Sequence, residues 1–443
     1  MSSPAPPHPR VAIVGSGISG LAVAHTLRGL AEVTLFEAGD YFGGHTHTVD
    51  ITLPTPRGEV THGVDTGFLV FNERTYPNLI NLFAELGVET AKSDMSFSVK
   101  VPGAGSDGKQ LEWSGSSLNS VFAQRGNLLN WKFLRMLKDI MRFNRVTTAV
   151  ASANAEAAMM QALGDFLKAN RFSDEFRDWY FLPMMGCIWS CPTDQMLQFP
   201  VATMIRFCYN HGLIQVANRP QWWTVKGGAR HYVEKIIASI PDKRLNTPVR
   251  LVERDLEGVR IITDGRAERF DKVVMATHSD QSLAMLRDAS TAEQSVLGSI
   301  RYQANHAVLH TDASVLPEKK LAWAAWNYER ASHARLADRQ STSVCLHYLL
   351  NMLQPLPFTQ PVVVSLNPVR EIARNHVMGE FDYAHPVFDA AAIRAQGELT
   401  HLQGQQNTYY CGAWTGYGFH EDGLKSGLQV ARQLLLETTG SAT

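Results

Sequence analysis

The sequence lacks several features that mark common classes of protein. Only five of its 443 residues are cysteines, and their scatter excludes a disulfide framework and favours a reducing, cytoplasmic setting. No apolar run approaches the roughly 20 residues of a membrane-spanning helix. The first ten residues, MSSPAPPHPR, have no apolar segment of the kind a secretion signal needs. Charged residues make up only 19% of the chain and the net charge is −1, so we expect no electrostatic recruitment of nucleic acid.

Signatures of hydrolases and metalloenzymes are also missing. The chain shows no serine–histidine–acid order, no paired catalytic carboxylates and no HExxH motif. The nearest histidine group, His45, His47 and His62, has spacing that suits a metal poorly, and Cys187 and Cys191 lack a second pair to complete a zinc site. We therefore expect no metal, and we expect the cysteines to be buried as small apolar side chains.

A glycine motif follows the first apolar segment. Residues 11–14 form a short apolar run typical of a buried parallel strand, and Gly15-Ser-Gly17-Ile-Ser-Gly20 comes directly after it. In a GxGxxG motif the glycines permit a tight turn, let the backbone approach a pyrophosphate and allow close packing of a helix on a strand. Glu37 ends the next strand, where a carboxylate accepts hydrogen bonds from a ribose diol. The sequence therefore predicts a βαβ dinucleotide-binding unit.

A second glycine pair favours FAD over NAD. Gly43-Gly44-His45-Thr46 begins six residues after Glu37. The simple NAD fingerprint has no use for a glycine pair at this distance, whereas a loop that runs back along a long extended cofactor needs one.

These motifs resemble the flavin-containing amine oxidase superfamily, which includes monoamine and polyamine oxidases, protoporphyrinogen oxidase and phytoene desaturase-type enzymes. Further segments resemble the same superfamily: Val64–Gly67, Gly227-Gly228, Thr247–Val249, Asp271–Thr277, Tyr410–Ala413 and Glu421–Gly427. Two positions depart from the pattern, because His45 stands where the family has arginine and Asp422 where it has glycine. The resemblance implies non-covalent FAD, with a second helix start near the C-terminus directed at the FAD diphosphate.

The motifs and the resemblance together imply a set of FAD-contacting residues. These are Gly15, Gly17, Ile18, Ser19, Gly20, Glu37, Ala38, Gly43, Gly44, His45, Thr46, Gly67, Val249, Thr277, Gly412, Ala413, Glu421, Asp422 and Gly423. The resemblance also implies three candidates near the flavin ring. His306 stands roughly where related enzymes carry a lysine near flavin N5, and Trp414 and Tyr417 stand where aromatic residues wall the flavin. The alternatives are a hydrogen-bonded strand histidine and ordinary packing.

The expected fold is α/β, a Rossmann-type FAD-binding domain with an inserted, mixed α+β substrate domain that contains a helical subdomain. Residues 1–10 are predicted to be a disordered lead. The FAD-binding domain is predicted to comprise 11–75, 225–300 and 405–443, and the substrate domain 76–224 and 301–404. Within them we expect a helix near 68–91, mostly helix over 127–182, strands between 244 and 276, and a last helix from about 422 to 436.

Three functions remain open at this stage. The segment GAWTGYGFHEDGLKSG resembles a bacterial subgroup of predicted NAD/FAD-binding proteins often associated with enzymes that methylate unsaturated fatty acyl chains. That association suggests an FAD-dependent desaturase or dehydrogenase of methylated fatty acyl chains in membrane lipids. The alternatives are an amine oxidase or polyene desaturase, and a non-catalytic flavin-binding protein. The electron acceptor and the oligomeric state are left open.

Residues 130–145, NWKFLRMLKDIMRFNR, combine apolar and basic side chains at helical spacing. A helix of this kind lies at a membrane interface, where cations meet anionic headgroups and the apolar face enters the acyl boundary. The alternative is a surface helix that packs on the substrate domain. Peripheral contact with the inner face of the membrane is therefore a hypothesis for an otherwise cytoplasmic protein.

Overall fold

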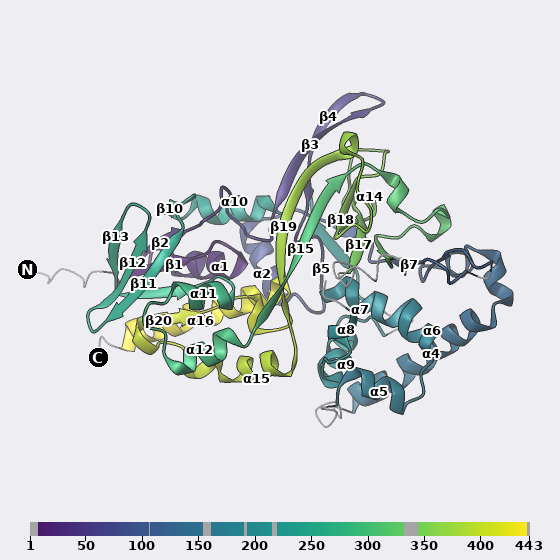
Figure 1. Ribbon diagram of the computed structural model, residues 1–443. Coiled ribbons are helices and arrows are strands. Elements are labelled where there is room, and N and C mark those ends of the chain that lie inside the picture. Colours follow the sequence, from purple (N-terminus) through teal and green to yellow (C-terminus); the bar gives the residue numbers. More distant parts are fainter. Residues whose placement is uncertain are drawn as a thin grey trace, which may run out of the picture.

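The computed structural model describes residues 8–105, 107–153, 161–189, 193–214, 219–331 and 344–440 (Figure 1). Most of the predicted disordered lead (residues 1–7) and Cys191 lie outside these residues, whereas the other four cysteines are buried as expected. No helix within the described residues has both the length and the apolar character needed to span a bilayer.

A five-stranded parallel sheet forms one end of the molecule (Figure 1). Its strands run in the order β10 (Asp242–Arg244), β2 (Glu32–Phe36), β1 (Arg10–Val14), β14 (Lys272–Met275) and β20 (Thr408–Tyr410). Three separate stretches of the chain therefore build it. The central strand β1 has the apolar sequence VAIV, and these four side chains are buried, as a strand covered on both faces requires.

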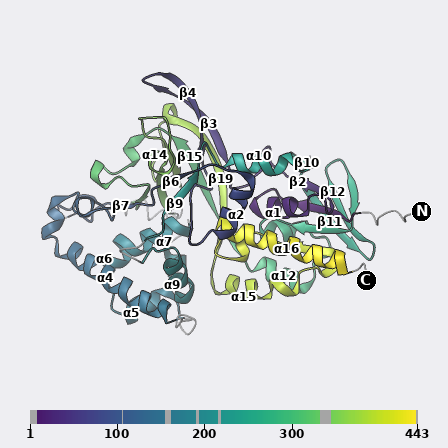
Figure 2. The same cartoon turned by 180° about the vertical axis from the view of Figure 1, so that it is seen from behind.

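Two helices with glycine-rich starts pack side by side against this sheet. These are α1 (Ile18–Leu27) and α16 (His420–Gly440), and Figure 2 shows α16 running along α1. A Cβ on Gly427 would lie 2.3 Å from the backbone oxygen of Ser19, so only glycine permits this approach. Other helices around the sheet are α10 (Arg230–Ala238), α11 (Ser279–Met285), α12 (Thr291–Gly298) and α15 (Ala390–Glu398). An antiparallel sheet of β11 (Val249–Asp255), β12 (Gly258–Thr263) and β13 (Ala267–Phe270) lies beside them.

A seven-stranded mixed sheet forms the middle of the molecule. Its order is β19 (Val377–Val387), β15 (Arg301–His310), β18 (Val363–Leu366), β17 (Cys345–Leu349), β16 (Trp326–Glu329), β7 (Phe97–Val101) and β8 (Leu111–Ser114). Two smaller sheets accompany it, the hairpin of β3 (Thr48–Thr55) and β4 (Gly58–Asp65), and the group of β5 (Phe71–Asn72), β9 (Trp222–Val225) and β6 (Thr90–Ser93). The long strands β15 and β19 pair over their whole length and reach back towards the parallel sheet (Figure 1).

Helices form the other end (Figure 1). They are α3 (Leu118–Val121), α4 (Trp131–Ser152), α5 (Leu163–Ala169), α6 (Asp174–Phe176), a π-helical turn (Arg177–Phe181), α7 (Leu182–Trp189), α8 (Thr193–Met196) and α9 (Val201–Asn210). The predicted helical region 127–182 is thus found. The helix expected near 68–91 is shorter, because α2 covers only Pro77–Leu86 and the chain on either side pairs with β9. A further short helix, α14 (Leu350–Leu353), follows β17.

Candidate functional site

The first glycine turn has the shape that its sequence predicts. Gly15 has φ +101°, and a Cβ there would lie 2.7 Å from the carbonyl oxygen of Ala276 on the neighbouring strand end. A Cβ on Gly20 would lie 2.0 Å from the carbonyl oxygen of Gly15. Gly17 differs, because a Cβ there would meet nothing within 4 Å. The first and third glycines are thus required by packing, whereas the second faces open space at the start of α1.

Both helix starts reach the same place. No side chain caps the N-terminus of α1, so its first N–H groups are left for another acceptor. A Cβ on Gly423 in the first turn of α16 would lie 2.8 Å from Ile18 and 3.0 Å from Ser19. The two N-terminal turns are therefore in direct contact, and their partial positive charges add at one point.

Glu37 lies against the glycine turn and is hydrogen-bonded to it. Its Oε2 accepts hydrogen bonds from the backbone N–H of Ser16 at 3.0 Å and the Ser16 hydroxyl at 2.5 Å, and its Oε1 accepts from Gly39 N–H at 2.8 Å. Thr247 donates its N–H to the Glu37 carbonyl and leads into Val249 at the start of β11. The carboxylate is thus held at the end of β2, beside the segment expected to contact adenine.

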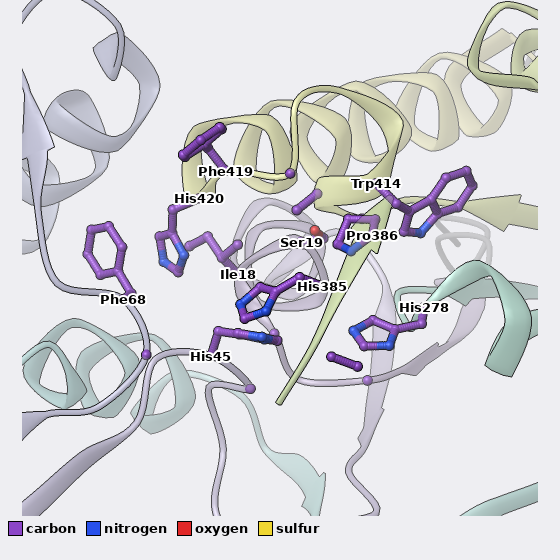
Figure 3. A pocket seen from close by; sticks show the side chains of 18 of the residues that line it. Ile18, Ser19, His45, Phe68, His278, His385, Pro386, Trp414, Phe419 and His420 are labelled. Carbon is purple, nitrogen blue, oxygen red and sulfur yellow. The ribbon is translucent and has the colours of Figure 1, made fainter. Parts of the chain in front are cut away.

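Three half-buried histidines gather next to Gly17. A Cβ on Gly44 would lie 3.2 Å from the Gly17 Cα, and His45 follows directly. The ring of His45 is centred 5.3 Å from that of His385 on β19 and 6.3 Å from that of His278 before α11 (Figure 3). Burial lowers the pKa of all three rings, well below 6.5 for His45 and to about 4 for His385, and each also lies near another histidine. They are therefore neutral in the ligand-free chain at pH 7.

The C-terminal turn is held by its own polar groups. Trp414 donates from Nε1 to the carbonyl oxygen of Thr277 at 3.1 Å. Asp422 accepts the backbone N–H groups of Tyr417 at 3.1 Å and Phe419 at 3.0 Å, and burial raises the pKa of its carboxyl to about 6. The residue that replaces the family's glycine thus fastens the turn to α16.

A single cavity of about 770 Å³ connects these elements. It begins at the glycine turn and Glu37, passes Gly43, Gly44 and the three histidines, and ends among side chains of the sheets and helices of the middle region. Its far end is apolar and aromatic, lined by Phe68, Leu69, Val70, Tyr76, Met95, Cys187, Ile188, Phe207, His211, Leu213, Trp222, Trp326, Tyr348 and Phe419. A volume of this size suits a small-molecule site.

His420 lines the cavity beside Phe68. Its ring stacks on Phe68 with centroids 4.0 Å apart (Figure 3), and its Nε2 is 2.7 Å from the hydroxyl of Tyr232. That hydroxyl in turn lies 2.5 Å from the Thr46 hydroxyl. Burial lowers the pKa of His420 to about 3, so this wall carries no charge at neutral pH.

Most of the FAD-contacting residues expected from the sequence line this cavity. They are Gly15, Gly17, Ile18, Ser19, Glu37, Ala38, Gly43, Gly44, His45, Gly67, Val249, Thr277, Gly412 and Ala413, together with Trp414. Five others stand behind the wall: Gly20, Thr46, Glu421, Asp422 and Gly423. Glu421 instead accepts hydrogen bonds from the N–H groups of Asn78 and Leu79 and so caps α2.

Two of the candidates near the flavin ring need correction. His306 does not line the cavity; its side chain is 45% exposed on β15, and its Nδ1 lies 3.0 Å from an Asp382 carboxylate oxygen. Tyr417 also lies behind the cavity wall, where its carbonyl accepts the indole N–H of Trp189. Phe419, which stacks on Phe207, occupies the wall instead.

Sequence reasoning missed His278, His385, Phe68 and His420 as lining residues. The signal for His420 was present, because it immediately precedes Glu421 in the C-terminal motif. His278 and His385 carry no motif, and only the tertiary fold brings them to His45. The other two histidines of the group near His45 have local partners: His47 bonds to Thr66, and His62 to the carbonyl of Gly63.

With this geometry in view, a sequence model of the flavin-containing amine oxidoreductases matches residues 18–312. The chain belongs to this family. The flavin amine oxidoreductase fold, the FAD cofactor and the oxidoreductase activity predicted from the motifs are thereby confirmed.

Solved structures of the same fold include a fatty acid isomerase from P. acnes that produces CLA (16% identity, TM-score 0.63, 96% of this chain and 98% of that chain). Cyclohexylamine oxidase from Brevibacterium oxydans is also similar (17% identity, TM-score 0.65, 98% and 100%). So is a putrescine oxidase bound to putrescine (15% identity, TM-score 0.66, 96% and 99%). No curated protein matches the sequence. At these identities the likeness concerns the fold alone.

The residues of this flavin amine oxidoreductase fit FAD. The open space over Gly17 and the uncapped start of α1 suit a diphosphate, and the cavity continues from there to both Glu37 and the aromatic end. The same cavity continues from the cofactor's place to its apolar, aromatic end.

Proposed function

We propose that this FAD-dependent oxidoreductase introduces a double bond into a fatty acyl chain of a membrane lipid. The preferred substrate is a methylated acyl chain. The observation that carries the proposal is the lining of the cavity's far end. Among the described residues that line the cavity, Glu37 is the only carboxylate, and it lies at the nucleotide end. An ammonium group in the apolar chamber would therefore meet no opposite charge, and burying it unpaired is costly.

The uncharged state of the chamber supports the same conclusion. Burial lowers the pKa of His211 to about 4 and that of His420 to about 3, so neither ring is charged at neutral pH. The His211 ring also stacks on the Phe207 ring with centroids 3.9 Å apart, and its Nδ1 is hydrogen-bonded to the backbone carbonyl of Phe207. The chamber is thus suited to methylene and methyl groups.

The chemistry requires loss of a hydride and a proton from neighbouring carbons, which leaves a carbon–carbon double bond. When bound, FAD supplies the hydride acceptor, and its reoxidation uses O₂ or another acceptor. The chain's own task is to orient the substrate and to exclude water. Phe68, Phe419 and Trp222 provide flat apolar walls for this purpose.

We propose roles for the lining residues on the same basis. Gly17, Ile18 and Ser19 contact the diphosphate at the start of α1, and Glu37 contacts the adenosine ribose. Two likenesses point to the acyl substrate itself. The fold is shared with an enzyme whose name specifies a fatty acid, and the C-terminal motif resembles the subgroup associated with acyl-chain methylation.

Amine oxidation is the second candidate. The stacked pair of Phe68 and His420, with Trp222 in the same cavity, provides aromatic faces that suit a neutral amine. The family also contains such enzymes, including cyclohexylamine oxidase, which shares the fold.

One experiment separates the two candidates. The purified yellow holoenzyme is mixed anaerobically with phospholipids bearing unsaturated or methyl-branched chains, with amines, or with polyenes, and loss of the visible flavin absorbance is followed. The proposal expects bleaching by acyl lipids and a new double bond by mass spectrometry. Bleaching by amines with peroxide formation in air, and none by lipids, would end the acyl proposal. Cells with and without the gene should differ in the double-bond count of their lipids.

A further inference from the structure

Large apolar side chains are exposed together on one part of the helical end. Eleven such side chains are exposed among the described residues, and six of them belong to residues 118–141: Leu118, Leu128, Leu129, Trp131, Leu134 and Met141. The other five are spread over the rest of the chain. Isolated exposed leucines need no explanation, but a cluster of this kind marks an interaction surface.

The helix α4 shows why these side chains are not simply part of the core. Its inner face buries Phe133, Met136 and Phe143 completely. Trp131, Leu134 and Met141 repeat at spacings of three and seven on the opposite face, with exposed fractions of 62%, 42% and 71%. An ordinary surface helix would carry polar residues at these positions.

Basic residues alternate with the apolar ones along this stretch. Between residues 113 and 152 the sequence has six basic side chains and one acidic one, Asp139. Asp139 is buried and paired with Arg142. Lys132, Lys138 and Arg145 point outward on α4, and a shallow cleft of about 580 Å³ beside the helix is lined by Arg135, Lys138, Arg142 and Arg171 together with Asp139 and Asp174.

We infer that this face, formed by residues 118–145, docks on the surface of an anionic lipid bilayer. Exposed apolar side chains interspersed with cations match the boundary between acyl chains and negatively charged headgroups. A protein partner would need no such excess of positive charge. We call this face the lipid-docking face.

The position of the lipid-docking face agrees with a lipid-handling enzyme. It lies at the helical end, away from the parallel sheet that begins the cofactor site (Figure 2). Helix α4 packs directly on α9, and α9 supplies Phe207 to the apolar end of the cavity. One layer of helix therefore separates the face from the chamber. The inference stands without the acyl proposal, since it depends only on the surface.

The test measures sedimentation of the holoenzyme with vesicles of phosphatidylcholine alone or mixed with phosphatidylglycerol. The wild type should bind the anionic vesicles, bind phosphatidylcholine weakly, and be released by high salt. Lys138→Glu should lower partitioning roughly 25-fold, about fivefold for each unit of charge. Leu129→Ser with Met141→Ser should lower it about tenfold or more for each side chain.

Matched controls use equally exposed residues elsewhere. Leu256→Ser and Arg57→Glu change solvent-exposed residues that lie outside residues 118–145, and both variants should bind vesicles as the wild type does. Retained flavin absorbance and an unchanged melting temperature show that the variants are folded. Absence of wild-type binding to anionic vesicles, equal binding by all variants, or loss of a homodimer in the Leu129/Met141 variant without any vesicle binding would overturn the inference. Flavin bleaching by a detergent-dispersed acyl lipid reports on the proposed function separately.

Discussion

Substitution of Gly17 by alanine should weaken FAD binding roughly 100-fold and leave the ligand-free fold intact. Gly17 has φ −62° and ψ 174°, an extended conformation that alanine adopts without strain. Its added Cβ would meet no protein atom within 4 Å. The small loss of helix capping on replacing glycine by alanine is about balanced by the reduced entropy of the unfolded chain. We therefore expect the free energy of unfolding of the ligand-free protein to change by less than about 1 kcal/mol.

The effect on FAD follows from what fills that space. A methyl group there holds the diphosphate away from the N–H groups of the first helical turn. Each hydrogen bond to a charged group contributes about 1.5–3 kcal/mol, so losing one or two of them costs about 3 kcal/mol. That corresponds to a roughly 100-fold higher dissociation constant for FAD.

The assay titrates the ligand-free protein with FAD and follows the quenching of flavin fluorescence, with thermal unfolding measured in parallel. Gly265→Ala is the matched control, since a Cβ there also meets nothing, but on a surface hairpin. Gly20→Ala should behave oppositely and unfold the ligand-free protein at lower temperature, because its Cβ would collide with Gly15. A Gly17→Ala variant that binds FAD as tightly as the wild type would refute the reasoning.

Three further predictions follow from the site. First, a bound diphosphate raises the pKa of the neutral histidines around His45, so FAD affinity should increase as the pH falls from 8 to 6. The variant His45→Arg should bind FAD more tightly than the wild type and with little pH dependence. A wild-type FAD affinity that does not change with pH would contradict this. Second, because the pKa of Asp422 is raised from 3.8 to about 6, the free energy of unfolding should fall by up to about 3 kcal/mol as the pH rises through that interval. Asp422→Asn keeps an acceptor oxygen. In scanning calorimetry of the ligand-free protein it should melt higher than the wild type at pH 7 but not at pH 4. Third, Ile188→Trp should fill the apolar chamber and prevent bleaching by acyl lipids at full FAD content, whereas Ile188→Val should retain it; equal turnover by both variants would place the substrate elsewhere.

The cofactor half of the site could be predicted because its signals are local. The contact between Gly15 and Gly20 lies within one turn of chain, and Glu37 directly follows the next strand, so sequence spacing fixes their relation. The last helix was predicted to begin at about residue 422, within two residues of the observed start of α16 at His420, for the same reason. In these segments a short motif and its geometry coincide.

The errors arise where distant segments decide the structure. Phe71 and Asn72 form a strand rather than a helix because they pair with Trp223 and Trp222, some 150 residues away. His306 was placed by analogy with a lysine, but β15 has left the cavity by that point: Tyr302 lines it, whereas His306 faces Asp382 on β19. No spacing rule relates His45 to His385 either, since only the fold brings them together.

Hydrogen–deuterium exchange of the protein with and without FAD tests most directly whether both helix starts serve one cofactor. We predict that residues 15–20 and 412–420 gain protection together, saturating at one FAD per chain. Protection of only one of these segments, or of neither, would contradict the account.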